Sequence, residues 1–352
     1  MDVAMEAAFA SRFDPSRDDD FCDRLLRLYS FIILVAFGAI LGSGAYFGVP
    51  IACAVSPEYS TTSHATSYIE NFCFLTSTYA VTSVEEKPEQ IFTAERNISY
   101  YQWAPLIIGI SLILLLVPNF VWRSLAPSYR KFPEISRSFN FILEPKQQEK
   151  LVVRASLVIR NVITNSNSPH QLAAVFIFIK FFILFILILE LLLFQFTLGP
   201  YNVLTFLSPK AALRAQNIRF PLNTQCSTKI YAQSLDNLVT ISARCVLPNN
   251  ILLFYFVVFC VYWFSFLFLV SLFNLIYWCV VLLNHGMRCR YILRRLYCHT
   301  DPKDLSKFVD ALGIDGIFMI HMTSKNGSDL FASMLTDYMY KIFLQSKFDI
   351  EE

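Results

Sequence analysis

Cysteine has the most definite chemistry in this chain, and four of the nine cysteines form two pairs. Cys53 and Cys73 lie in one polar segment between apolar stretches, and Cys226 and Cys245 lie in another. In an oxidising compartment an even set of this kind forms disulfides, here two bridges with three possible pairings. A metal site is the alternative, but no histidine stands at ligand spacing within either pair. We therefore expect two disulfides, no metal ion and no cofactor.

A second set of candidates is ionisable. Asp2 and Glu6 lie one helical turn apart in an apolar N-terminal segment, so a ring of copies would present carboxylates to cations in a pore. A frayed terminus or a short interfacial helix is the alternative. Lys180 and Glu190 lie inside an apolar stretch; Lys180 can snorkel to the surface, whereas Glu190 is expected to contact a helix or water. No nucleophile and base accompany them, which argues against an intramembrane enzyme.

Long apolar stretches must position these residues. The chain is 55% hydrophobic and 16% charged, too apolar for an ordinary soluble protein. A bilayer core of about 30 Å needs roughly 20 apolar residues in a helix. Four stretches qualify, at residues 28–47, 100–122, 172–198 and 251–283. The last is longer than a bilayer requires and must tilt or project. These four stretches would contact membrane lipid. No phosphate-binding loop appears in the sequence, and we expect the chain to bind no nucleic acid.

The distribution of Lys and Arg predicts the orientation. The segments 1–27, 123–171 and 284–352 hold 21 of them, whereas 48–99 and 199–250 hold seven. Basic residues favour the cytosolic side, so we expect both termini and the middle loop in the cytosol. The four paired cysteines then lie outside the cell. Asn97 begins a glycosylation sequon there, close to the membrane, and whether it is modified stays open.

The second stretch has aromatic residues where it begins. Tyr100, Tyr101 and Trp103 are typical of the headgroup level, and Pro105 lies in the first turn, where its missing N–H costs little. Pro118 is expected to kink the helix near its far end.

The predicted cytosolic segments carry helical patterns. Residues 151–163 show helical apolar spacing, and Asp301 with Pro302 begins a helix that Gly313 ends. Residues 316–322 suggest a strand or a short extended segment. Ser328 is then expected to cap a helix that continues to about residue 344. The elements of the C-terminal segment, from Asp301 onward, predict a small helical cytosolic module.

The order of several short motifs resembles the innexins, the invertebrate gap-junction family related to pannexins. The resemblance spans nearly the whole chain. Its best-known part is Tyr100, Tyr101, Gln102, Trp103, Ala104 and Pro105. The others are residues 18–25; Gly48, Pro50, Ile51 and Cys53; Glu70, Asn71, Cys73, Thr78 and Tyr79; Pro118, Trp122 and Arg123; residues 244–249; and residues 312–316. The chain departs from the family at Ala54 and Phe74, where a tryptophan commonly follows each first-loop cysteine, which puts the packing of that loop in doubt.

The resemblance implies both a fold and a function. The fold is an all-α membrane protein with four transmembrane helices, two disulfide-linked extracellular loops and a helical cytosolic module. The implied pairs are Cys53 with Cys245 and Cys73 with Cys226. The implied function is that of a gap-junction subunit in the plasma membrane. The subunits would form homo- or hetero-oligomers, as octameric rings with the N-terminus in the pore. Each ring would dock with a hemichannel of the adjacent cell, and the channel would pass ions and small metabolites.

Other functions stay open. A pannexin-like hemichannel would not dock, and a glycan at Asn97 would favour it by crowding the rim. A regulatory subunit without its own conductance is another possibility. An adhesion or scaffold protein is a third, although the cysteine and glycine motif of tetraspanins is absent.

Overall fold

The computed structural model describes residues 21–46, 48–55, 63–76, 78–80, 97–98, 100–126, 144–165, 170–198, 208, 210, 220–232, 237–297, 300–326 and 328–351. The chain divides into two compact units. Unit 1 comprises residues 1–30, 115–186 and 267–352, and unit 2 comprises residues 31–114 and 187–266. Each unit is described by itself below.

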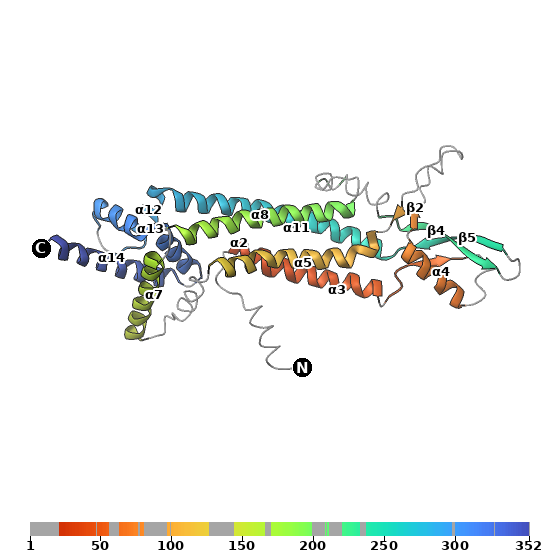
Figure 1. The fold of residues 1–352 in the computed structure, drawn as a ribbon, viewed down its shortest axis with the longest axis horizontal. Helices are drawn as coiled ribbons and strands as arrows, with labels where there is room; N and C mark the ends of the chain where they lie inside the picture. The colour runs from red at the N-terminus through yellow and green to blue at the C-terminus, as the bar shows by residue number, and fades with distance from the viewer. Residues whose placement is uncertain are drawn as a thin grey trace. The chain divides into compact units, whose positions relative to one another are not determined.

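Four segments form helices long and apolar enough to cross a membrane. The first consists of α2 (Phe21–Arg24), a π-helical turn (Leu25–Tyr29) and α3 (Ser30–Tyr46). The others are α5 (Tyr100–Leu125), α8 (Gln171–Leu198) and α11 (Asn249–Leu283), all visible in Figure 1. The four predicted stretches are therefore helical, and the predicted fold class of a mostly helical four-span protein is confirmed.

Aromatic and small side chains pack the helices within unit 2. Phe256 of α11 lies 5.0 Å from the ring of Phe37 on α3 and 6.1 Å from that of Phe194 on α8. At Gly38 of α3, an added Cβ would lie only 3.1 Å from the side chain of Ile108 on α5. The glycine therefore permits the close approach of α3 and α5.

The rest of unit 2 contains a sheet that the sequence did not predict. Its five strands are antiparallel in the order β1-β5-β4-β2-β3. Two of them, β4 (Asn223–Ala232) and β5 (Asn237–Val246), pair along their whole length. The shorter ones are β1 (Ala52–Ala54), β2 (Thr78–Ala80) and β3 (Asn97–Ile98), with α4 (Ser63–Thr76) between β1 and β2. Both polar segments of the chain thus contribute strands to one sheet (Figure 1).

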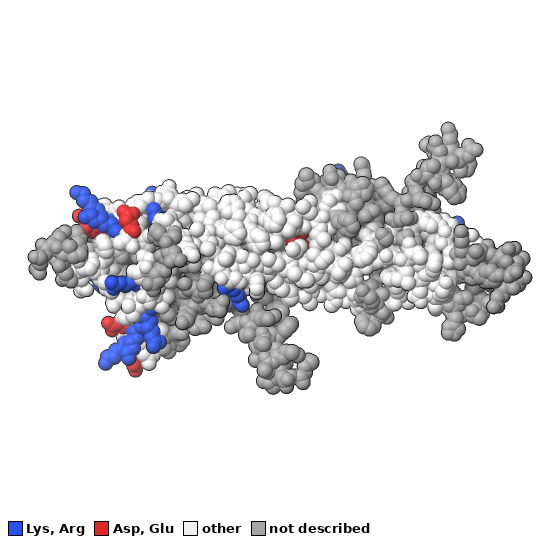
Figure 2. All heavy atoms as spheres, in the orientation of Figure 1, with Lys and Arg blue, Asp and Glu red and all other residues white. Residues whose placement is uncertain are grey.

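Unit 1 contains the predicted helical module. It consists of α7 (Pro145–Asn165), α12 (His285–Leu293), α13 (Pro302–Asn326) and α14 (Asp329–Glu351), and α13 contacts the other three. Figure 2 shows charged side chains gathered over these helices, while few are visible along the apolar helices on the face drawn.

Two glycines shape α13. Gly313 has φ 65°, in the left-handed region that favours glycine, and it interrupts the helix at the point where the sequence predicted an end. At Gly316, an added Cβ would lie 3.1 Å from the side chain of Ile163, so the missing side chain lets α13 approach α7 closely.

The predicted extended segment at residues 316–322 is wrong, because the chain is helical there. Ile317, Phe318, Met319 and Ile320 are all fully buried. The β-branched and aromatic residues that suggested a strand are instead the apolar residues of a helix packed on several sides. Tertiary packing overrides local propensity in this segment.

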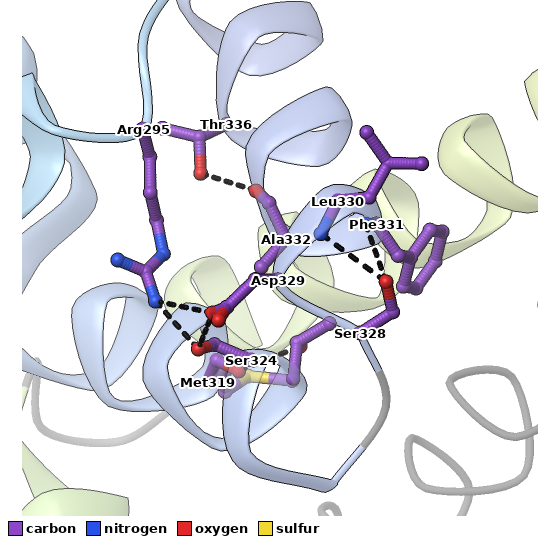
Figure 3. Close-up of polar contacts among 10 residues, drawn as sticks. Arg295, Met319, Ser324, Ser328, Asp329, Leu330, Phe331, Ala332 and Thr336 are labelled. Atoms are coloured by element: carbon purple, nitrogen blue, oxygen red, sulfur yellow. Dashed lines mark hydrogen bonds and ion pairs between the residues drawn. The ribbon is translucent and has the colours of Figure 1, made fainter.

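Side-chain caps define the turn between α13 and α14 (Figure 3). Ser328 Oγ accepts hydrogen bonds from the amides of Leu330 and Phe331, at 3.2 and 3.5 Å, as an N-cap residue does. Arg295 reaches this turn from the end of α12, and its Nη2 donates to Ser324 Oγ at 2.5 Å and to Asp329 Oδ1 at 3.2 Å. The predicted helix start at Ser328 is confirmed.

Candidate functional site

Two disulfides hold the sheet of unit 2 together. Cys53 on β1 is bonded to Cys245, the residue of β5 that lies opposite it in the sheet. Cys73 on α4 is bonded to Cys226 on β4. The bridges join residues 192 and 153 positions apart in the chain. These are the two pairs that the resemblance implies.

The disulfides form the centre of a small hydrophobic core, here called the disulfide core. All four half-cystines are at most 8% exposed. The remaining buried members are Ile51, Ile69, Ala243 and Leu247. Among the described residues, the sulfurs of Cys53, Cys73 and Cys245 also form the one group close enough to bind a metal ion, but these sulfurs are already joined in disulfides.

Polar contacts fix the elements around the disulfide core. Glu70 on α4 accepts a hydrogen bond from the backbone amide of Cys53 at 3.1 Å. Thr224 on β4 donates from its hydroxyl to the carbonyl of Cys245 at 3.3 Å. Each contact involves a backbone group of a half-cystine. The first joins α4 to β1 and the second joins β4 to β5.

The aromatic motif at the start of α5 binds to the disulfide core. The hydroxyl of Tyr101 lies 3.4 Å from the carbonyl oxygens of both Cys73 and Phe74, and its ring lies 5.4 Å from that of Phe74. Gln102 Nε2 also donates to the carbonyl of Phe74. These carbonyls belong to the last turns of α4 (Ser63–Thr76), whose terminal carbonyls have no partner within the helix. The motif thus supplies donors to the end of α4 and attaches it to a membrane helix.

The other motif residues have different surroundings. Tyr100 is buried and its ring meets that of Phe220 edge-on at 5.0 Å. Trp103 is 53% exposed, as expected for a residue at a lipid or headgroup surface. Pro105 lies in the first turns of α5 (Tyr100–Leu125), where the sequence predicted it. Close by, Asn250 at the start of α11 donates to the carbonyl of Pro221 at 2.9 Å.

Three other candidate residues lie wholly or partly outside the part of the chain that the structure describes. Asp2 and Glu6, the predicted pore residues, lie outside the described residues. Asn97, the predicted glycosylation site, begins β3, where it is paired with Tyr79 of β2. The side chain of Asn97 also lies outside the described part of the chain.

The two ionisable residues of α8 both have polar partners. In unit 2, Glu190 is fully buried and accepts a hydrogen bond from Ser111 on α5, which is also fully buried. The sequence predicted a protein or water contact for Glu190 but gave no sign of Ser111. The signal available was only that Ser111 interrupts an apolar stretch.

In unit 1, Lys180 forms a buried ion pair rather than snorkelling. Its Nζ lies 2.6 and 2.7 Å from the two carboxylate oxygens of Asp23 on α2, and Lys180 is only 2% exposed. The same Nζ lies 4.8 Å from the centre of the Phe176 ring. Asp23 is thus a partner that the sequence analysis missed, because it belongs to an acidic run that is typical of a solvated helix start.

Comparison with known proteins identifies the class. The model of the innexin family matches residues 19–343, so the chain belongs to the innexin family. This membership, with the four apolar helices, places it among the multi-pass gap-junction channel proteins of the plasma membrane. Members of this family are channel proteins, not enzymes, and they act as oligomeric assemblies.

Several Caenorhabditis elegans proteins are similar to this chain over most of its length. Innexin-6 is 25% identical, with 98% of this chain and 94% of the relative covered. Innexin unc-9 is 24% identical, with coverage of 94% and 93%. Innexin-11 is 23% identical, with coverage of 95% and 81%.

Proposed function

We propose that this chain forms a homo- or hetero-oligomeric ring, octameric by analogy with its family, that docks with a hemichannel of the adjacent cell. The channel passes ions and small metabolites. Residues 48–99 and 199–250 lie outside the cell, and residues 1–27, 123–171 and 284–352 lie in the cytosol. This orientation is supported by the Lys and Arg distribution and by the disulfides, which form in oxidising compartments.

The disulfide core attached to α5 supports the proposal most strongly. Docking two rings requires a surface whose backbone keeps its shape without the partner, because each segment ordered on binding costs free energy. Two buried disulfides and the antiparallel sheet meet this requirement. The hydrogen bonds of Tyr101 and Gln102 connect that surface to a membrane helix.

The N-terminal segment is the proposed pore lining. Asp2 and Glu6 of each subunit would give a wide pore two rings of carboxylates, which bias conduction toward cations without excluding anions. Neutralising them with Asp2→Asn and Glu6→Gln should lower the cation preference, measured as the shift in reversal potential under a salt gradient. An unchanged reversal potential in the double variant would contradict this lining.

Paired-cell recording tests the whole proposal. Cells that lack endogenous gap junctions express only this chain, and the conductance between two apposed cells is measured. We expect a junctional conductance that disappears in Cys73→Ser and persists in Cys279→Ser, a control cysteine outside the disulfides. Absence of junctional current from wild-type chain that reaches the surface would contradict it.

The sequon at Asn97 supports a second candidate, a hemichannel that does not dock. A glycan there would lie in an outer segment and crowd the approach of another ring. A glycosidase-dependent mobility shift that is lost in Asn97→Gln, together with single-cell but no junctional current, would favour the hemichannel. Junctional current only on coexpression with another innexin would instead favour a regulatory heteromeric subunit.

A further inference from the structure

A thiol, an imidazole and a carboxylate form a cluster in unit 1, outside the disulfide core. Cys289 and His285 lie one turn apart on α12, and the thiol sulfur lies against the imidazole ring, 3.6 Å from Nδ1 and 3.9 Å from Nε2. The other ring nitrogen, Nε2, is 3.0 Å from Oδ1 of Asp310 on α13. The three side chains therefore form a chain of contacts from thiol to imidazole to carboxylate.

This order of contacts activates a thiol. When Nε2–H donates to Asp310, Nδ1 is the basic ring nitrogen and the nearer of the two to the sulfur, so His285 can take the thiol proton. Asp310 also stabilises the imidazolium that results. Two features hold the three side chains in place. Asn284 caps the start of α12 by accepting a hydrogen bond from the amide of Met287 at 3.3 Å, and α12 packs on α13.

The thiol keeps its proton until an electrophile arrives. Partial burial and the Asp310 carboxylate raise the pKa of Cys289, and Arg288 opposes the rise. Oxidation by peroxides requires a standing thiolate, which a raised pKa disfavours. A reaction in which a base removes the proton during attack is favoured instead.

The surroundings favour a fatty acyl donor. The first residue of α12 lies two positions after Leu283, the last residue of the membrane helix α11. Leu283, Leu293 and Tyr297 are exposed by 65%, 49% and 67%, so apolar surface continues past both ends of α12. Arg288, Arg290 and Arg294 add positive charge that attracts anionic headgroups and phosphorylated thioester carriers.

We propose that Cys289 is a site of reversible S-acylation, at which the thiol accepts a fatty acyl group from an acyl-coenzyme A thioester with His285 as general base. Sγ forms a bond to the thioester carbonyl carbon, and the bond from that carbon to the coenzyme sulfur breaks. The Cys289 proton passes to His285 Nδ1 and then to the departing thiolate. No atom is oxidised or reduced. Asp310 is a positioning residue that acts through His285.

Acylation would hold α12 and the helical module against the bilayer, because the attached chain partitions into the membrane beside α11. The inference rests on the proposed cytosolic position of residues 284–352, where acyl-coenzyme A is available. Labelling of Cys289 in intact cells by a membrane-impermeant maleimide would show that this orientation is wrong. That result is distinguishable from failure of acylation at a cytosolic thiol.

The cellular test uses hydroxylamine, which cleaves thioesters and exposes the thiol for capture. Full-length chain expressed in animal cells should be captured in a hydroxylamine-dependent manner. The signal should be lost in Cys289→Ser and retained in Cys22→Ser, which removes a thiol on the same proposed side of the membrane. Capture that persists in Cys289→Ser, or wild-type chain whose Cys289 carries a sulfenic acid but no acyl group, would overturn the proposal.

A second test measures the chemistry directly. Purified full-length protein is incubated with palmitoyl-coenzyme A and the mass increase is followed with time. Relative to wild type, His285→Ala should acylate about 100-fold more slowly. Asp310→Asn should also be slower, and Asp310→Glu should recover most of the rate, which a purely structural role would not predict. Equal rates in wild type and His285→Ala, with unchanged elution in gel filtration, would contradict the assigned base.

Discussion

The disulfide core of unit 2 and the helical module of unit 1 are stabilised by different kinds of contact. The disulfide core is held by two covalent bridges, which join cysteines that are 192 and 153 residues apart in the chain. The helical module contains no disulfide among its described residues and depends on packing and caps. Its interior includes Phe308 on α13 and Tyr340 on α14, both buried, whose rings meet edge-on at 5.2 Å.

The difference follows from the compartments that the two regions occupy in the proposed topology. Outside the cell a single small sheet with one short helix can bury little apolar surface, so covalent bridges compensate. In the cytosol thiols stay reduced, and stability must come from burial. The comparison predicts that the two regions respond differently to reduction and to core substitutions.

Removal of a disulfide should have the largest effect. Cys53→Ser opens a bridge that closes a very long loop, and we expect a loss of about 4 kcal/mol of stability. Thermal unfolding in detergent and the amount of protein at the cell surface would both decrease. Cys279→Ser, which breaks no bridge, is the control. Equal melting of the Cys53→Ser and Cys279→Ser variants would show that the covalent bridge does not stabilise the disulfide core.

The buried ion pair of unit 1 should come next. Lys180→Met leaves the carboxylate of Asp23 without its partner in a nearly buried position, at an expected cost of about 3 kcal/mol. The double variant Asp23→Leu and Lys180→Met removes both charges and should recover most of that loss. Thermal unfolding of the single and double variants measures the coupling, and additive effects would contradict a direct pair.

The motif contact should have a smaller effect. Gln102→Leu removes one of the two donors to the carbonyl of Phe74, which we expect to cost about 1 kcal/mol and to loosen α4 from α5. Trp103→Phe, at an exposed neighbouring position, is the matched control and should change stability by less than about 0.5 kcal/mol. Hydrogen exchange in α4 provides the readout. Faster exchange in both variants alike would rule out a specific contact.

The smallest effect concerns pH. Asp315 on α13 accepts from the amides of Leu172 and Ala173, at 3.1 and 2.8 Å, but desolvation by burial raises its pKa despite these hydrogen bonds. The folded state therefore holds this proton to a higher pH than the unfolded state does. The contribution of Asp315 to stability should rise as pH falls toward the ordinary range of Asp.

Asp315→Asn should abolish this dependence, so its stability relative to wild type should fall as pH decreases from 7 to 5. Thermal unfolding of both forms across this range is the measurement. A wild type that loses more stability than Asp315→Asn on acidification would have the opposite sign from the one predicted.

The sequence predicted the membrane helices well and the polar segments poorly. The predicted stretch 172–198 differs from α8 (Gln171–Leu198) by one residue at its start, because hydrophobic length alone determines a span. The sheet was missed although β5 alternates polar and apolar residues from Thr240 to Cys245, a signal that the sequence analysis did not use. In β4 two of the buried positions are polar, Thr224 and Thr228, which weakens the signal there. The disulfides and the pairing with β1 and β2 join these two strands to the first polar segment, and no local pattern contains those long-range contacts.

The polar partners within the helices were also beyond prediction. Lys180 and Asp23 are 157 positions apart, and Ser111 and Glu190 are 79 apart. A hydropathy profile indicates that a charged residue lies within a membrane span. Because burying a charge in the bilayer costs free energy, such a residue needs a polar partner. Which helix faces supply that partner depends on helix rotation, and this is a tertiary property.

The location and pairing of the disulfides test the account most directly. Protein biotinylated on intact cells is isolated without reduction, digested and analysed for cross-linked peptides. The account predicts peptides joining Cys53 to Cys245 and Cys73 to Cys226, with these cysteines reachable by an impermeant thiol reagent only after reduction from outside the cell. Free thiols at these positions, a different pairing, or labelling only from the cytosol would contradict it.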